Sequence, residues 1–150
     1  MSSTSTSGAV GSVLAVDANI LISALRRGKA MRLLTSPRLV FLTTIRTTWE
    51  VERYLPTLAS ELSARAVVVD HVQLRERFHS LPLVALPESF YSALLPEARR
   101  LIERRDPTDA DILALTLRVS VPLWTNDRHF DGIAEIRTVT TAELLALLGL

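Results

Sequence analysis

The sequence predicts an α/β fold, a three-layer α/β/α sandwich built around a mainly parallel sheet. Short, continuous apolar runs recur along the chain, and such runs are typical of strands that are buried on both faces. Segments with the three- and four-residue spacing of helices separate these runs, and this alternation favours right-handed crossovers between parallel strands. With 150 residues, 48% of them hydrophobic and 22% charged, the chain has the size and composition of one soluble globular domain.

Five apolar runs are predicted to form the strands of this sheet. Residues that favour turns or helix starts bound them, as Pro82 and Pro87 bound the third run and Asn126 follows the fourth. Because nearly every position within a run is apolar, each strand is expected to be covered on both faces. The predicted strands are residues 13–16, 39–42, 83–86, 122–125 and 136–139.

Helices are predicted between and after these strands. Thr43 and Thr44 are candidate N-caps for the helix after the second strand, and Pro56 is expected to kink or divide that helix. Another helical pattern is expected to be interrupted or to restart near Pro96. The predicted helices are residues 19–25, a helix that carries Trp49 to Leu58, a helix within 67–78, a helical segment over 88–105, a helix starting near 106–109 and continuing to 119, and 142–148 behind Thr140 or Thr141.

The amino-terminal residues and the overall composition indicate where the protein is located and which ligands it can bind. Residues 1–11 are rich in Ser, Thr and Gly without the charge and apolar core of a signal peptide, so we expect a disordered tail ahead of a single domain over 12–150. The chain has no cysteine, so oxygen or histidine would have to ligate any metal. No apolar run reaches membrane-spanning length, and we predict a cytoplasmic protein. A net charge of +1 neither demands nor excludes nucleic acid.

Four acidic residues lie where the predicted strands end or the neighbouring helices begin. Asp17 directly follows the first strand, and Asp127 follows the fourth by two residues. Glu50 lies in the first turns of the helix after the second strand, and Asp109 lies at the start of the helix before the fourth. Because ligands bind at the carboxyl ends of the strands in such folds, we expect these four carboxylates to converge.

Converging carboxylates repel one another unless a cation lies between them. Hard divalent cations such as Mg²⁺ and Mn²⁺ take oxygen ligands and are the natural partners of such a cluster. The chemistry that follows is phosphodiester hydrolysis, in which a metal ion makes a water nucleophilic and a second ion, if present, stabilises the leaving oxygen. The acids therefore predict a metal-dependent nuclease.

Each acid also has a purely structural interpretation. Asp17 is placed to cap the helix that follows it, and Asp127 belongs to an Asn-Asp pair of the kind common in turns. Glu52 competes with Glu50, but residues two apart in a helix leave it in nearly opposite directions, and we favour Glu50. Asp109 is one of several acids in the first turns of its helix, where the helix dipole favours negative charge in any case. We favour Asp109 as the site residue and keep Asp111 as an outside candidate.

Other chemistries find less support in the sequence. Ser, His and Asp show no arrangement of a nucleophile triad, and no glycine-rich phosphate loop is present. Asn19 stands where aspartyl-phosphate phosphatases use a second acid, which counts against that class. His71 and His79 are expected at the solvated surface or a partner contact, whereas His129 lies close enough to Asp127 to be a candidate phosphate contact.

Four segments together resemble the motifs of PIN domains. Residues 16–21, Val-Asp-Ala-Asn-Ile-Leu, are similar to the opening motif, and Thr44 with Glu50 is similar to the second. Residues 109–116, Asp-Ala-Asp-Ile-Leu-Ala-Leu-Thr, resemble the third motif, and residues 123–130, Leu-Trp-Thr-Asn-Asp-Arg-His-Phe, resemble the fourth. The motifs stand in the family's order and span residues 13–139.

This resemblance implies an α/β/α sandwich, dependence on Mg²⁺ or Mn²⁺, and endoribonuclease activity on RNA. It also implies a homodimer and, in bacteria and archaea, frequent roles as the VapC-type toxin of a toxin–antitoxin pair with an antitoxin protein as partner. On this sequence it implies Asp17, Glu50, Asp109 and Asp127 as catalytic metal ligands. On the substrate side it implies Asn19 and Thr125 as polar supports and Arg128 as a phosphate contact, with Arg26 and Arg46 as alternatives to Arg128.

Two other functions are weighed beside the ribonuclease. One is a PIN-like binding or scaffold module without catalysis, and the other is a structure-specific DNA nuclease, which the acids alone cannot separate from a ribonuclease. We also expect apolar residues within 81–95, Phe90 and Tyr91 among them, to form an exposed patch that a symmetric dimer buries, with packing in the core of the domain as the alternative.

Overall fold

The structure is a computed structural model that describes residues 12–26, 28–103 and 105–150. The expected amino-terminal tail, residues 1–11, lies outside the described residues. In chain order the elements are β1 Val13–Val16, α1 Ala18–Leu25, α2 Ala30–Leu34, β2 Val40–Thr44, α3 Ile45–Ala64, α4 His71–His79, β3 Leu83–Leu86, α5 Glu88–Tyr91, η2 Ser92–Leu94, α6 Leu95–Leu101, η3 Pro107–Asp109, α7 Ala110–Val119, β4 Leu123–Trp124, η4 Arg128–Phe130, β5 Thr138–Val139 and α8 Thr141–Leu148.

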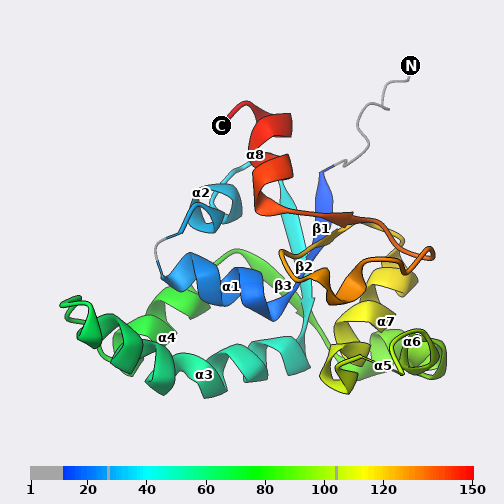
Figure 1. The fold of residues 1–150 in the computed structure, drawn as a ribbon, viewed down its shortest axis with the longest axis horizontal. Coiled ribbons are helices and arrows are strands. Elements are labelled where there is room, and N and C mark those ends of the chain that lie inside the picture. The colour runs from blue at the N-terminus through cyan, green and yellow to red at the C-terminus, as the bar shows by residue number, and fades with distance from the viewer. Residues whose placement is uncertain (1–11, 27, 104) are drawn as a thin grey trace.

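A five-stranded sheet in the order β3-β2-β1-β4-β5 forms the middle layer. Every neighbouring pair is parallel, with Leu14 opposite Phe41 between β1 and β2, and Ala15 opposite Leu123 between β1 and β4. Figure 1 shows α1 to α4 on one side of this sheet and α5 to α7 on the other. The predicted α/β/α sandwich with a parallel sheet is therefore confirmed.

Successive residues of the inner strands enter two different cores. Leu14 and Val16 pack with α1 to α4 and α8, whereas Ala15 between them packs with α6 and α7. Trp124 and Leu123 divide in the same way between the two faces. This alternation follows from the two-residue period of a strand, and it explains why the strands are apolar at almost every position.

Most predicted elements appear close to their predicted places. The third strand has its predicted bounds, and Thr44 caps α3 by accepting a hydrogen bond from the backbone N–H of Thr47 at 2.8 Å. A second helix starts at Leu95 with Pro96 in its first turn, as the restart near Pro96 predicts. The last two strands are shorter than their apolar runs, because only two residues of each pair with a neighbour.

The structure corrects two expectations. Helix α3 runs from Ile45 to Ala64 without a break, so Pro56 does not divide it; the ring lies on the exposed side of the helix, where its missing N–H costs one hydrogen bond. Tyr91, expected in an exposed patch, is only 1% exposed and packs in the core beside α6 and α7. Apolar composition alone does not reveal which face of a short helix turns inward.

The topology brings several chain segments to one edge of the sheet. Strand β1 ends at Asp17, which caps α1, and strand β2 ends at Thr44, which caps α3. Figure 1 shows the starts of α1 and α3 at this edge, facing the group formed by α5, α6 and α7. None of the helices in the described part of the chain is both long and apolar enough to span a bilayer.

Candidate active site

Asp17 is the most deeply placed of the predicted acids, with 6% of its surface exposed. Its Oδ1 accepts a hydrogen bond from the backbone N–H of Ala18 at 2.8 Å, and its Oδ2 accepts one from the Asn19 side chain and one from the Thr125 hydroxyl, both at 3.0 Å. Burial raises the pKa of Asp17, and the charge of Asp127 adds to this effect, while the hydrogen bonds oppose it. Asp17 is thus a helix cap and also a carboxylate that hydrogen bonds hold in one orientation and whose charged form is disfavoured by burial.

Asn19 and Thr125 act on Asp17 and on each other. The Asn19 side chain donates to the Thr125 hydroxyl at 3.3 Å, and the Thr125 hydroxyl also accepts the backbone N–H of Asp127 at 3.0 Å. These bonds fit the predicted role of polar supports. Thr125 is only 2% exposed and has little surface to offer a substrate directly.

Asp109 stands at the end of η3, where α7 begins, and faces the other acids. Burial raises its pKa to about 7, and the charges of Asp17, Asp106 and Asp127 add to this effect in that order. The Asp109 Oδ2 atom is buried and accepts no hydrogen bond, and His129 Nδ1 lies 3.7 Å from it, beyond hydrogen-bonding distance. An unpaired buried carboxylate oxygen costs free energy, and a cation beside it would remove that cost.

Glu50 completes the group from α3. Burial raises its pKa, and the charges of Asp17 and Asp106 contribute next. Asp127 reaches the group from the loop after β4, where its Oδ2 lies 3.1 Å from His129 Nδ1. The structure therefore places the four predicted acids at one edge of the sheet. The charge of Asp17 raises the pKa of Glu50 and of Asp109, and the charge of Asp127 raises the pKa of Asp17 and of Asp109.

The donor set fits a hard divalent cation. It consists of carboxylate oxygens, one of them buried and unpaired, together with the unpaired buried Oδ1 of Asn19. As the side chains stand, no three Asp, Glu or His residues within the described ranges lie close enough to hold one metal ion. Coordination would therefore require the side chains to move closer together, and a bound cation would offset the repulsion between their charges.

Three other predicted residues make ion pairs with partners outside the four acids. Glu52 pairs with His79 at 3.1 Å between α3 and α4, away from the acids. Arg26 lies at the end of α1, where it pairs with Glu61 at 2.7 Å, so it points away from the acidic edge. Arg128 is on η4 with 91% of its side chain exposed and pairs with Asp131 at 3.1 Å.

The structure adds residues that the sequence analysis did not assign. The buried Tyr91 hydroxyl donates to Asp111 Oδ2 at 2.5 Å, and Asp111 Oδ1 lies 3.6 Å from Arg46 Nε. Asp111 thus lies between a core tyrosine and a surface arginine. Trp49, the residue before Glu50, is 57% exposed. The exposed tryptophan was visible in the sequence only as an apolar helix residue.

Comparison with solved structures supports the same fold. VapBC2 from Rickettsia felis, solved with a DNA fragment from its promoter, aligns with a TM-score of 0.66 and 13% identity over 85% of this chain and 98% of that chain. FitAcB from Neisseria gonorrhoeae aligns with a TM-score of 0.62 and 18% identity over 86% and 98%. A toxin–antitoxin complex from Klebsiella pneumoniae aligns with a TM-score of 0.55 and 20% identity over 85% and 97%. At these identities the likeness shows the fold.

The family follows from sequence comparison. No curated protein sequence matches this chain significantly. A family model of the PIN domain matches residues 15–148, which include all four motifs and all four acids. Proteins of this family are generally nucleases. The chain belongs to the PIN-domain family.

Proposed function

We propose that this chain is a metal-dependent endoribonuclease that hydrolyses RNA phosphodiester bonds. The observation that carries the proposal is the meeting of Asp17, Glu50, Asp109 and Asp127 at one sheet edge, with an unpaired buried oxygen on Asp109. Mg²⁺ or Mn²⁺ is the cation that these oxygen ligands favour. When bound, such a cation supplies Lewis acidity and activates water for attack on phosphorus.

The residues of the chain have separate roles in this proposal. Asn19 and Thr125 hold the Asp17 carboxylate in one orientation through their hydrogen bonds. His129 lies between Asp109 and Asp127, at 3.7 and 3.1 Å, where its protonated form would offset their charge. Arg128 is highly exposed, and in this proposal its guanidinium exchanges the surface pair with Asp131 for a substrate phosphate.

We further propose that an antitoxin protein restrains the enzyme. One of the solved structures with this fold is a toxin–antitoxin complex, and the resemblance of the motifs points to the same setting. A PIN-like scaffold without catalysis and a DNA nuclease are the competing functions. The scaffold is disfavoured because buried, mutually repelling carboxylates cost stability unless a cation compensates for them.

Cleavage of single-stranded RNA and of DNA of the same sequence, with Mn²⁺ and with EDTA, tests the proposal. We expect RNA cleavage that requires Mn²⁺, and we expect Asp17→Asn to reduce it by more than the roughly 10- to 100-fold that loss of an outer-shell partner costs. Asp70→Asn is the matched control, because Asp70 also caps a helix, α4, but lies outside the site. Cleavage of DNA alone would favour the DNA nuclease.

A melting experiment separates the scaffold from the enzyme. A cation that binds only the folded state must raise the melting temperature, so Mn²⁺ should stabilise the parent and the Asp70→Asn variant. Asp17→Asn should gain little from Mn²⁺. Absence of both stabilisation and cleavage in the parent would leave the scaffold as the function.

A further inference from the structure

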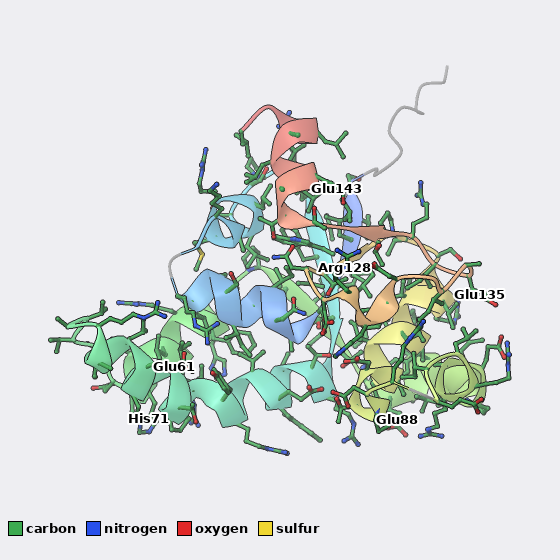
Figure 2. All side chains as sticks on the ribbon, in the orientation of Figure 1. Glu61, His71, Glu88, Arg128, Glu135 and Glu143 are labelled. Atoms are coloured by element: carbon green, nitrogen blue, oxygen red, sulfur yellow. The ribbon has the colours of Figure 1, made fainter. Side chains whose placement is uncertain are left out.

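A pocket of about 470 Å³ adjoins the acids on the side of α3, within the size range of roughly 300–1,000 Å³ typical of ligand sites. One wall is a stripe of α3 side chains, Arg46, Trp49, Glu50 and Arg53, whose spacing of three and four residues places them on one face of the helix. The opposite wall comes from α5 to α7. Figure 2 places Glu88 beside this wall and Glu61 at the other end of α3. Glu50 thus belongs both to the acid group and to the pocket.

The two tryptophans of the chain have opposite surroundings. Trp124 is fully buried, and its indole N–H donates to the Thr141 hydroxyl at 3.0 Å. Trp49 is 57% exposed at the mouth of the pocket, although tryptophan is highly buried on average. An exposed indole one residue before a proposed metal ligand offers a flat stacking surface next to the reacting phosphate.

The arginine side chains that line the pocket around this indole could bind a polyanion such as a nucleic-acid backbone. Arg46 is held near the pocket by Asp111, which the buried Tyr91 fixes in turn. Arg53 and Arg99 line the pocket and are exposed, and within the described residues no carboxylate lies at ion-pair distance from either guanidinium. The acids in the lining are Asp111, paired with Arg46, the metal ligand Glu50, and Glu88.

We propose that this pocket binds one nucleotide of single-stranded RNA beside the cleaved bond, with its base stacked on Trp49 and its backbone phosphates against Arg53 and Arg99. An aromatic platform flanked by cations is the arrangement with which proteins bind unpaired strands. A duplex keeps its bases paired and stacked and cannot offer one to the indole. The inference rests on the proposed ribonuclease and names its substrate as unpaired RNA.

Steady-state cleavage of a single-stranded oligoribonucleotide with Mn²⁺ tests the stacking. Loss of one base–aromatic stack corresponds to about 5- to 150-fold in affinity, so Trp49→Ala should raise KM within this range and leave kcat within a few-fold. Trp49→Phe keeps an aromatic face and should restore most of the loss. Arg53→Gln should raise KM and lower the dependence of binding on salt by about 0.7 in the logarithmic slope, whereas the matched Arg75→Gln on α4 should do neither.

Fluorescence reports on the pocket independently of cleavage. In EDTA, which stops metal-dependent cleavage, single-stranded RNA should quench the emission of Trp49, and Trp49→Phe, which retains Trp124, should show no quenching. Duplex RNA of the same sequence should quench far less. Quenching without any cleavage by the parent would overturn the ribonuclease and leave the pocket standing. Cleavage by Trp49→Ala with the parental KM, together with no quenching in the parent, would overturn the assignment of this pocket to RNA.

Discussion

Two glutamates of α3, separated by one residue, face different parts of the molecule. Glu50 is held among the acids, where burial and the charge of Asp17 raise its pKa. Glu52 lies on the side of α4 and pairs with His79, an exposed contact of the kind that adds at most about 1 kcal/mol of stability. The rotation of about 100° per residue along a helix separates their environments completely.

The two glutamates make a matched pair of variants. Glu50→Gln removes a proposed ligand and should reduce Mn²⁺-dependent RNA cleavage by at least about 10-fold. Even the loss of a residue that only supports a metal ligand lowers metal affinity or activity by that much. Glu52→Gln should leave cleavage within about 2-fold of the parent, because it changes only a surface pair. Initial rates across a Mn²⁺ titration measure both. Loss of cleavage in Glu52→Gln alone would reverse the assignment.

Asp109 makes the stability of the metal-free protein depend on pH. Its pKa is raised to about 7 in the folded protein, from an unfolded value of 3.8, so between these values the folded state holds a proton that the unfolded state has released. The free energy of unfolding therefore falls as pH rises through this window. In EDTA, urea unfolding between pH 5 and pH 8 should show this loss, and Asp109→Asn should show a smaller one. Parallel curves for the two proteins would contradict the assignment.

At the scale of the elements, helix α3 positions Glu50 in the acid group and Trp49 in the pocket. Thr44 fixes its start at the sheet edge, and its inner face buries Val51, Leu55 and Leu58. The same helix presents the pocket stripe on another face, so that packing on one side sets the direction of Trp49 and Glu50 on the other. Pro56 is the one element-breaking residue inside it.

Replacing this proline should stabilise the helix. Proline in a helix interior is less favourable than alanine by about 3 kcal/mol, and the freedom that Pro56→Ala returns to the unfolded chain offsets roughly 0.4–1 kcal/mol of this. We expect a gain of about 2 kcal/mol, which raises the melting temperature of a domain of this size by roughly 4–8 °C. Cleavage should not change. A lower melting temperature would mean that the rigidity of Pro56 aids packing.

At the scale of the whole molecule, the parallel order of the strands creates the site. Strand β1 lies between β2 and β4, so Asp17 after β1 has as neighbours the start of α3 on one side and the loop of Asp127 on the other. Asp109 reaches the same edge because η3 and α7 pack across the second face of the sheet. Four acids that are distant in the chain therefore meet.

We predict that the molecule is a homodimer. Within the segment 81–95, Val84 on the edge strand is 46% exposed and Phe90 is 36% exposed beneath Arg118, although Tyr91 and Leu95 are buried. Light scattering at micromolar concentration should give twice the 16.6 kDa of one chain. Val84→Arg should shift this mass toward the monomer, whereas Val72→Arg, on exposed α4, should not. A parental mass near 16.6 kDa would contradict the prediction.

The sequence by itself determined the order of strands and helices, the parallel sandwich and the family. These features are local: apolar runs, capping residues such as Thr44 and Thr140, and acids directly after strand ends all act within a few residues. Asp17 could be placed at the sheet edge because the end of a parallel strand fixes where the next residue lies. That the four acids bind a metal ion is a proposal, whether it is argued from the sequence or from the structure.

Only the tertiary structure decided which side chains meet across the chain. It buried Tyr91 against Asp111, kept α3 continuous through Pro56, and set Trp49 and Arg53 opposite Arg99, about a third of the chain away on α6. The spacing of apolar residues shows that a helix has a buried face. Which residues lie opposite its other face depends on where helices from distant parts of the chain pack on the sheet. That placement is fixed by the packing of the two cores as a whole, and no short stretch of sequence contains it.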